Sequence, residues 1–304
     1  MRQIRNHLGQ PIGEEVPQWK PRPRPERVYL EGNYARLEPL QASKHADALY
    51  RANSLDAQQA LWTYLPYGPF PNQESYFGWV KEMSERQDPL FFAVVDREIS
   101  RAVGVAAYLR IEPEHGCLEV GHICYSPLLQ DRPAGTEAMY LLMRYVFEEL
   151  AYRRYEWKCD ALNEPSRRAA QRLGFSFEGV FRQACVVKGR NRDTAWYAMI
   201  DKDWPALKTA YERWLSPDNF DANGVQKERL SLLTAPLLRR DIQELSEELS
   251  CSRLVQQNIE QHETEQSDAY PTVESKEGQI HTTNVVWFYQ ALFVENKGSH
   301  NDQP

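Results

Sequence analysis

The sequence predicts an α/β chain whose mixed central sheet is flanked by helices, and three observations carry this prediction. Short segments with apolar and polar residues in alternation recur from residue 34 onward, a pattern typical of strands. A long segment that opens at Pro133 carries an apolar stripe at helical spacing. Strand-like and helix-like segments then follow one another along the chain, which favours a sheet with helices on its faces.

The first half of the chain provides one strand, two helices and three further strands. YARLEPL, at 34–40, alternates like a half-buried strand. Ser43 is the expected N-cap of a helix that carries Ala46 and Leu49, and Asn72 is the expected N-cap of a second helix. The three strand-like segments that follow are PLFFAVVD, AVGVAAYLRI and CLEVGHICY.

The second half begins with the helix at Pro133, which we expect to run to residue 151. YEWKCDA is the next strand, and a helix from about Asn163 ends at Gly174, a C-cap signal. The last strands are FSFEGVFRQACVVKG and TAWYAMID, separated by the turn-like GRNRD, and a helix over 204–215 closes the series.

Four segments are expected along the chain. Residues 1–29 form a Pro- and Arg-rich extended arm, residues 30–215 the folded domain and residues 216–235 a linker. Residues 236–304 are an acidic tail rich in Gln and Glu, mostly disordered. Two interpretations of the arm are open: a ligand for a proline-recognising domain, or a segment packed on its own domain and held by Trp19.

Charge and cysteine content narrow the function classes. The net charge of −7 is carried by the residues from Pro236 onward, so the preceding chain is neutral, which argues against nucleic acid as a partner. Five cysteines without a CxxC predict no disulfide framework. No apolar run is long enough to cross a membrane, and we expect a cytoplasmic protein. His115, Cys117, His122 and Cys124 match no zinc pattern, so no metal is expected.

The segment EVGHICYSPLLQDRPAGTEAMYLLMRY is a strand, a short loop and a helix start. Free N–H groups and the dipole of such a helix end attract anions, and Gln130 and Arg132 could reach the oxygens of a pyrophosphate. The alternative is an ordinary connection. In the later segment CDALNEPSRRAAQRLGF, Asn163 and Ser166 could contact the same ligand or serve only as helix-start residues. Arg167, Arg168 and Arg172 could meet phosphates, and the alternative, which is the commoner case, is a solvated face.

Taken together, the QxxxxGTEA helix start, LNEPSRRAAQRLGFSFEGVFR and GRNRDTAWYAMIDKDW resemble the GNAT superfamily of acyl-CoA N-acyltransferases, in its ribosomal-protein (RimJ/RimL) branch. The resemblance covers about residues 30–215. It implies a GNAT-like, mostly antiparallel sheet, acetyl-CoA as co-substrate and a primary amine as acceptor.

The resemblance also implies site residues. The positions that match its pyrophosphate loop are Gln130, Arg132, Ala134, Gly135 and Thr136. Backbone groups of Ile123, Cys124 and Tyr125 match the strand that pairs with the pantetheine arm, and Asn163 and Ser166 match the second cofactor-facing helix. The chain departs from the family at Pro133, usually glycine, and at Ala170, where many relatives carry the tyrosine that protonates the thiolate; water or Ser166 must then serve.

Glu119 matches the general base of several superfamily members, and burial in a cleft would raise its pKa toward neutrality. The alternatives are a structural carboxylate, with a water chain as base, or His122. Tyr64, Tyr67 and Phe70 are expected either to line the acceptor site or to belong to the core.

The sequence thus predicts an acetyl-CoA-dependent N-acetyltransferase that acts on a protein N-terminus or a small-molecule amine by direct attack on the thioester. The alternative is a CoA-binding regulatory or interaction module without catalysis. No signal points to a particular oligomeric state.

Overall fold

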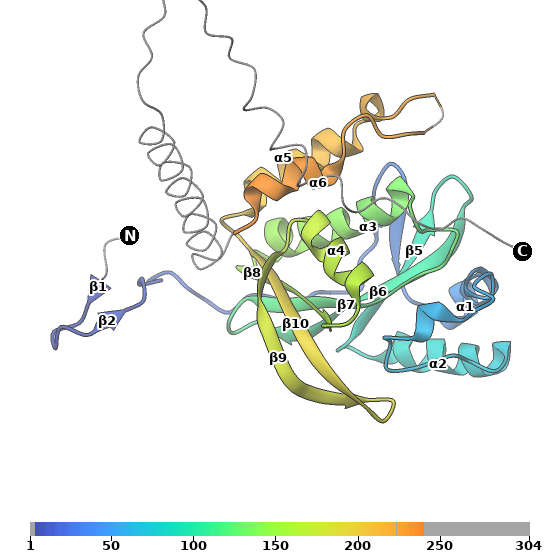
Figure 1. The fold of residues 1–304 in the computed structure, drawn as a ribbon, viewed down its shortest axis with the longest axis horizontal. Helices are drawn as coiled ribbons and strands as arrows, with labels where there is room; N and C mark the ends of the chain where they lie inside the picture. The colour runs from blue at the N-terminus through green and yellow to red at the C-terminus, as the bar shows by residue number, and fades with distance from the viewer. Residues whose placement is uncertain (1–3, 223, 240–304) are drawn as a thin grey trace, which may run out of the picture. The chain divides into compact units, whose positions relative to one another are not determined.

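The structure of the chain is a computed structural model that describes residues 4–222 and 224–239. All but the first few residues of the predicted tail, 236–304, lie outside the described residues. An eight-stranded sheet forms the centre of the domain (Figure 1). Its strands, in spatial order, are β3 (Leu30–Glu31), β4 (Ala35–Pro39), β5 (Leu90–Asp96), β6 (Arg101–Glu112), β7 (Cys117–Tyr125), β8 (Arg154–Asp160), β10 (Arg190–Ile200) and β9 (Ser176–Val187).

Neighbouring strands of the sheet are antiparallel with one exception, the parallel pair β7 and β8. A parallel pair needs a crossover connection, and here the crossover contains α3 (Pro133–Arg144) and the π-helical turn Tyr145–Glu149. The expected mixed, mostly antiparallel sheet is therefore confirmed.

Helices cover both faces of the sheet. On one face lie α1 (Ala42–Asn53) and α2 (Gln73–Glu85), and on the other lie α3, α4 (Glu164–Arg172) and α5 (Trp204–Leu215), with the short α6 (Leu230–Thr234) beside them (Figure 1). Because successive side chains of a strand point to opposite faces, β5 serves both layers. Phe92 and Val94 pack in the α3 layer, and Phe91 and Ala93 pack in the α1–α2 layer.

Two details differ from the predicted elements. The first helix begins at Ala42, so Gln41 and not Ser43 is its N-cap, and the Gln41 N–H donates to His45 Nδ1 at 3.0 Å. The RNRD residues belong to β10, and only Lys188 and Gly189 make the turn, both with positive φ. The Asn72 cap is confirmed, since its side chain accepts from the Ser75 N–H.

The N-terminal arm packs along the β6–β7 hairpin, as the second interpretation of its prolines expected. The indole of Trp19 donates to the Glu114 carbonyl at 2.9 Å, and the Arg22 N–H donates to Pro113 O. The ring lies against Gly116, where φ is +59° and a Cβ would overlap the indole, so only glycine suits this turn. The arm begins with a two-stranded hairpin, β1 (Ile4–Arg5) and β2 (Pro11–Ile12).

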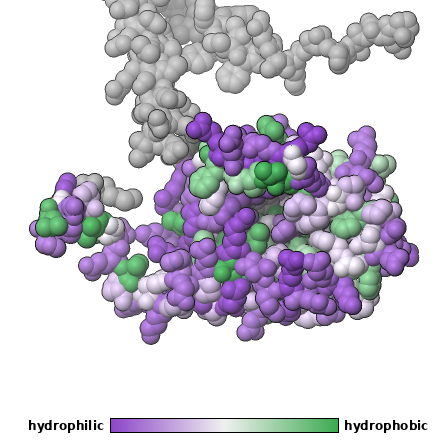
Figure 2. All heavy atoms as spheres, turned by 90° about the horizontal axis from the view of Figure 1, so that it is seen from below, coloured by the Kyte–Doolittle hydropathy of each residue, from purple (hydrophilic) through white to green (hydrophobic). Residues whose placement is uncertain are grey.

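The segment 216–235, expected as a linker, packs on the domain. Leu230 is fully buried, and Thr234 Oγ1 donates to the Arg172 carbonyl at 3.0 Å. The face drawn in Figure 2 is largely hydrophilic, with apolar residues scattered over it, which is ordinary for a protein surface. Among the helices of the described residues, none has the length and apolar character that crossing a bilayer requires.

Glu38 of β4 contacts Lys44 and His45 of α1, and its replacement tests how much these contacts stabilise the packing of α1 on the sheet. Its buried carboxylate pairs with Arg36 and Lys44, and it lies 2.9 Å from His45 Nε2. Burial alone would raise the pKa of Glu38, but its three partners together lower it from 4.5 to about 2. We expect Glu38→Gln to reduce the free energy of unfolding at pH 7 by about 3 kcal/mol.

The deficit should shrink as the pH falls from 4.5 toward 2, because the folded state holds this carboxylate ionised more strongly than the unfolded state does. Urea unfolding at pH 7 and pH 3 measures it. Glu31→Gln, at an exposed carboxylate paired with Arg36 and Arg97, is the control and should change stability by less than about 1 kcal/mol. A deficit that is the same at both pH values would contradict this account of Glu38.

Candidate active site

The site is built on the separation of β7 from β8. Residues Cys117–Val120 of β7 pair in register with Arg154–Trp157 of β8. Both strands continue past this point, but among the described residues no further pairing joins them. The edge of β7 over Gly121–Tyr125 therefore presents backbone N–H and C=O groups that β8 does not use, and such groups need partners. The predicted cofactor-facing residues Ile123, Cys124 and Tyr125 lie on this edge.

A β-bulge lies where the strands separate. His122 and Ile123 of β7 stand opposite the single residue Ala106 of β6, and His122 has a φ of +51°. The imidazole stacks on the Tyr67 ring at a centroid distance of 5.6 Å, and its Nδ1 is buried with no partner among the described residues. Burial, together with the charges of three arginines, lowers the pKa of His122 to about 4, so its ring is neutral at pH 7.

The predicted pyrophosphate loop lies between β7 and α3. The first turn of α3 holds three buried residues, Ala134, Gly135 and Thr136, and no side chain of residues 4–222 or 224–239 caps it. Gln130 and Arg132, however, have protein partners. Gln130 Nε2 donates to the Tyr125 carbonyl at 2.8 Å, and Arg132 pairs with Asp96 at 3.0 Å and with Glu98. These two side chains brace the loop between β7 and the end of β5.

Arg172 is the cation that does approach this helix start. Its Nη1 donates to Thr136 Oγ1 at 3.1 Å, and its guanidinium lies over the Trp214 ring at 5.3 Å. Within the described part of the chain it has no carboxylate partner within ion-pair distance. Sequence analysis left Arg172 either as a phosphate contact or as part of a solvated face, and the fold brings it to the start of α3. Arg167 and Arg168 bond elsewhere, to Tyr197 and Glu164.

The start of α4 holds Asn163 and Ser166. Asn163 is the N-cap, and its Oδ1 accepts the Ser166 N–H at 3.2 Å. The Ser166 hydroxyl accepts a hydrogen bond from Trp157 Nε1 at 3.0 Å. Asn163 thus has the structural role that the alternative interpretation gave it. The Ser166 hydroxyl also bonds the Cys159 side chain of β8, and this bond opposes the rise in the pKa of Cys159 that burial causes.

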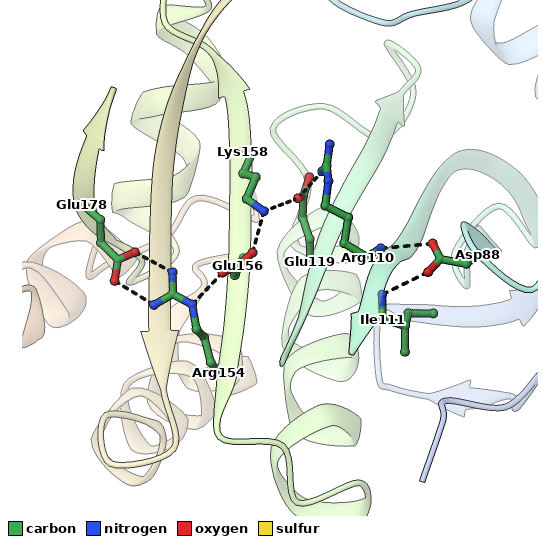
Figure 3. A network of polar contacts seen from close by, with 8 residues as sticks. All are labelled: Asp88, Arg110, Ile111, Glu119, Arg154, Glu156, Lys158 and Glu178. Atoms are coloured by element: carbon green, nitrogen blue, oxygen red, sulfur yellow. Dashed lines mark hydrogen bonds and ion pairs between the residues drawn. The ribbon is translucent and has the colours of Figure 1, made fainter. Parts of the chain in front are cut away.

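Glu119 belongs to a network of charges on the α1–α2 face of the sheet (Figure 3). Its side chain is only 4% exposed and pairs with Arg110 of β6 and, at 3.2 Å, with Lys158 of β8. Lys158 Nζ is also 2.7 Å from Glu156, and Arg154 links Glu156 to Glu178. Burial raises the pKa of Glu119, although Arg110 and Lys158 favour its ionised form.

The connection between α1 and α2 carries the three predicted acceptor residues. Tyr67 and Phe70 lie in one aromatic cluster with Trp79, and the Tyr67 hydroxyl is buried with no hydrogen-bond partner among the described residues. Tyr64 instead reaches across to the β8–α4 connection, where its hydroxyl donates to the Leu162 carbonyl at 3.3 Å. From the β9–β10 turn, Lys188 donates to the carbonyl of Trp62 at 2.6 Å. This connection therefore crosses the separated strands.

Sequence analysis did not identify Lys158, Arg110 and Arg192 as site residues. Arg192 lies on β10, and its Nε is buried with no hydrogen-bond partner in the described part of the chain. Its charge acts on both His122 of β7 and Cys159 of β8. These three residues are far apart in sequence and form no local motif. Only the order of β6, β8 and β10 in the sheet brings them to one region. Among the described residues no cluster of side chains could hold a metal ion.

Comparisons with known proteins agree with this geometry. The acetyltransferase (GNAT) domain model matches residues 35–176. A GCN5-related N-acetyltransferase from Brucella melitensis is 50% identical, with a TM-score of 0.71 over 72% of this chain and 100% of that one. A probable GNAT-family acetyltransferase from Chromobacterium violaceum is 37% identical, with a TM-score of 0.60 over 65% and 98%. The putative ribosomal N-acetyltransferase YdaF of Bacillus subtilis is 34% identical over 73 residues, 24% of this chain and 40% of that relative.

The charge network predicts strong coupling between Lys158 and Glu119. Lys158→Met should reduce the free energy of unfolding by about 3 kcal/mol, because it leaves two buried carboxylates without a shared cation. Combined with Glu119→Gln it should cost at least about 1 kcal/mol less than the sum of the two single changes. Urea unfolding of the four proteins measures this cycle. Lys202→Met, at a largely exposed lysine, is the control, and additive effects would contradict the coupling.

Proposed function

Because this chain belongs to the GNAT family of N-acetyltransferases, we propose that it transfers an acetyl group from acetyl-CoA to an α-amino group, either of a protein N-terminus or of a small molecule. Membership of an acetyltransferase family favours an enzyme over a CoA-binding module without catalysis. The observation that carries the proposal is the separation of β7 from β8, because it places backbone groups, a helix start and a buried carboxylate around one gap.

The chain's own groups fit the co-substrate. We assign the pyrophosphate to the first turn of α3, with N–H groups of Ala134 and Thr136 as donors and Arg172 as the cation. The Gly135 N–H donates to the Arg132 carbonyl at 3.1 Å and is not counted among these donors. Pro133 removes one donor from this turn, and Arg172 offsets that loss. Backbone groups of Ile123, Cys124 and Tyr125 would pair with the amide-bearing arm of CoA as a neighbouring strand would. Gln130 and Arg132 hold the loop in shape through Tyr125 and Asp96.

The reaction requires a neutral amine, a polarised carbonyl and a proton for the departing thiolate. Glu119 is the proposed base, directly or through water, because it is the buried carboxylate on β7 that faces the gap from the α1–α2 side. The bulge at His122 interrupts the regular pairing of β7 beside the gap and is the proposed place for the thioester oxygen. Ser166 is the proposed acid, since its hydroxyl can turn from Cys159 toward the thiolate and Ala170 has no hydroxyl.

The electrostatics around Glu119 favour acceptors of low pKa. An α-amino group has a pKa near 7.8 and is roughly 14% neutral at pH 7, whereas a lysine amine is only about 0.04% neutral. The difference is worth roughly 3.5 kcal/mol. Glu119 is held by two cations, which weakens it as a base and also disfavours a second ammonium nearby. The name of YdaF, a putative ribosomal N-acetyltransferase, supports a protein N-terminus as the acceptor.

Arg172→Met should raise the Kd of acetyl-CoA about tenfold or more, because it removes a charged partner of the pyrophosphate. Isothermal titration calorimetry measures the effect. Arg168→Met is the matched control on the same helix, since Arg168 is exposed and paired with Glu164, and it should leave the Kd unchanged. Equal acetyl-CoA affinities of the two variants would contradict the assignment of the pyrophosphate to the first turn of α3.

Glu119→Gln should lower turnover most at low pH and progressively less as the pH rises, because alkaline solution supplies neutral amine without a base. Initial rates from pH 6 to pH 9.5 measure this profile. A loss of the same size at every pH would identify Glu119 as a structural member of the charge network instead.

The acceptor is tested with two matched peptides, one with a free N-terminus and no lysine, the other N-acetylated with a single lysine. We expect the first to be acetylated at least about a hundredfold faster at pH 7, in line with the difference in neutral amine. Faster acetylation of the lysine peptide would overturn the proposed preference for α-amino groups.

A further inference from the structure

A small pocket lies in the α1–α2 layer, where the last turn of α1 meets the connection to α2. Its volume is about 210 Å³. Four aromatic residues line it, Tyr50, Trp62, Phe70 and Tyr76, together with the polar side chains of Asn53 and Asp56. None of the residues that line it is basic. Neither Asn53 nor Asp56 has a role in the acetyl transfer described above.

Asn53 and Asp56 provide this pocket with hydrogen-bond acceptor atoms that lack a donor or a cation among the described residues. Asn53 is 7% exposed, and its Nδ2 donates to the Tyr76 hydroxyl at 3.3 Å, while its Oδ1 is buried with no partner among the described residues. Asp56 accepts the Leu61 N–H at 2.9 Å through Oδ2, and no cation of the described residues pairs with its carboxylate. Buried acceptors normally have donors, so this pocket favours a ligand that donates.

The aromatic walls favour the same kind of ligand. The Trp62 and Phe70 ring centroids are 5.4 Å apart, Phe70 and Tyr76 are 5.1 Å apart, and Tyr50 packs on Tyr76 at 5.8 Å. Aromatic faces attract organic cations, especially at sites partly removed from water. A metal ion is disfavoured, since hard cations need six or more oxygen ligands and Asp56 is the single carboxylate among the described residues that line the pocket.

We propose that this pocket is a binding site for an organic cation, an ammonium or guanidinium group of the size of a lysine or arginine side-chain terminus. Asp56 supplies the charge, Asn53 Oδ1 accepts one hydrogen bond, and the aromatic rings cover the apolar part of the ligand. The site goes beyond the proposed acetyl transfer and does not depend on it. It adjoins the aromatic cluster of the α1–α2 connection, because Phe70 lines the pocket and also packs against Tyr67 and Trp79.

The test uses the full chain without acetyl-CoA and two probes of the same shape, n-butylguanidinium and its neutral analogue n-butylurea. Calorimetric or NMR titration should show n-butylguanidinium binding at least tenfold more tightly. Asp56→Asn should weaken this binding at least tenfold, since it removes the charge but keeps an oxygen for the Leu61 N–H. Asp47→Asn, at an exposed carboxylate of α1 that bonds Arg51 and Gln73, is the control and should bind like the parent protein.

If Asp56→Asn fails to fold, Tyr50→Leu tests the aromatic wall instead and should weaken n-butylguanidinium binding severalfold. Equal binding of the two probes, no binding of either, or undiminished binding by the variant would each overturn the proposal. Acetyl transfer plays no part in these measurements, so a failure here is distinct from a failure of the proposed function.

Discussion

The separation of β7 from β8 is the constraint on which the rest of the site depends. A sheet normally satisfies its backbone groups strand by strand, and this one stops doing so at Val120. The bulge at His122 turns the backbone of β7 at the same level. α3 follows β7 after the loop 126–132, so its first turn lies at the end of the gap. α4 follows β8 and brings Arg172 to that turn. One local break in pairing thus positions a strand edge and a helix start together.

The charge network around Lys158 shows how the sheet stays intact on the other side of this break. Lys158 lies between Glu119 and Glu156, with its ammonium 3.7 Å from the Trp196 ring centroid. Glu119 belongs to β7, whereas Glu156 and Lys158 belong to β8. The ion pair between Glu119 and Lys158 therefore connects the two strands where their backbone pairing ends. Arg110 extends the connection to β6, and the backbone N–H groups of Arg110 and Ile111 donate to the Asp88 carboxylate (Figure 3). A residue suited to catalysis is therefore also part of the framework.

Local patterns predicted the elements well because their signals lie within a few residues. The Asn72 and Asn163 caps, the strand at 117–125 and the closing helix at 204–215 follow from periodicity and capping chemistry alone. Long-range pairing was not accessible in this way. Nothing near Arg172 indicates that α4 will turn this arginine, rather than Arg167 or Arg168, toward Thr136. The bulge at His122 was equally hidden, since a left-handed conformation is more often marked by glycine.

The contacts of Tyr64 with Leu162 and of Lys188 with Trp62 make the α1–α2 connection a bridge over the separated strands. The helix start and Arg172 belong to the opposite layer of the sheet. If the two substrates bind as proposed, they approach the gap from opposite faces, and neither blocks the entry of the other. Both must then be present together when the acetyl group moves. Such an enzyme forms a ternary complex, and its double-reciprocal plots intersect instead of running parallel as in a ping-pong reaction.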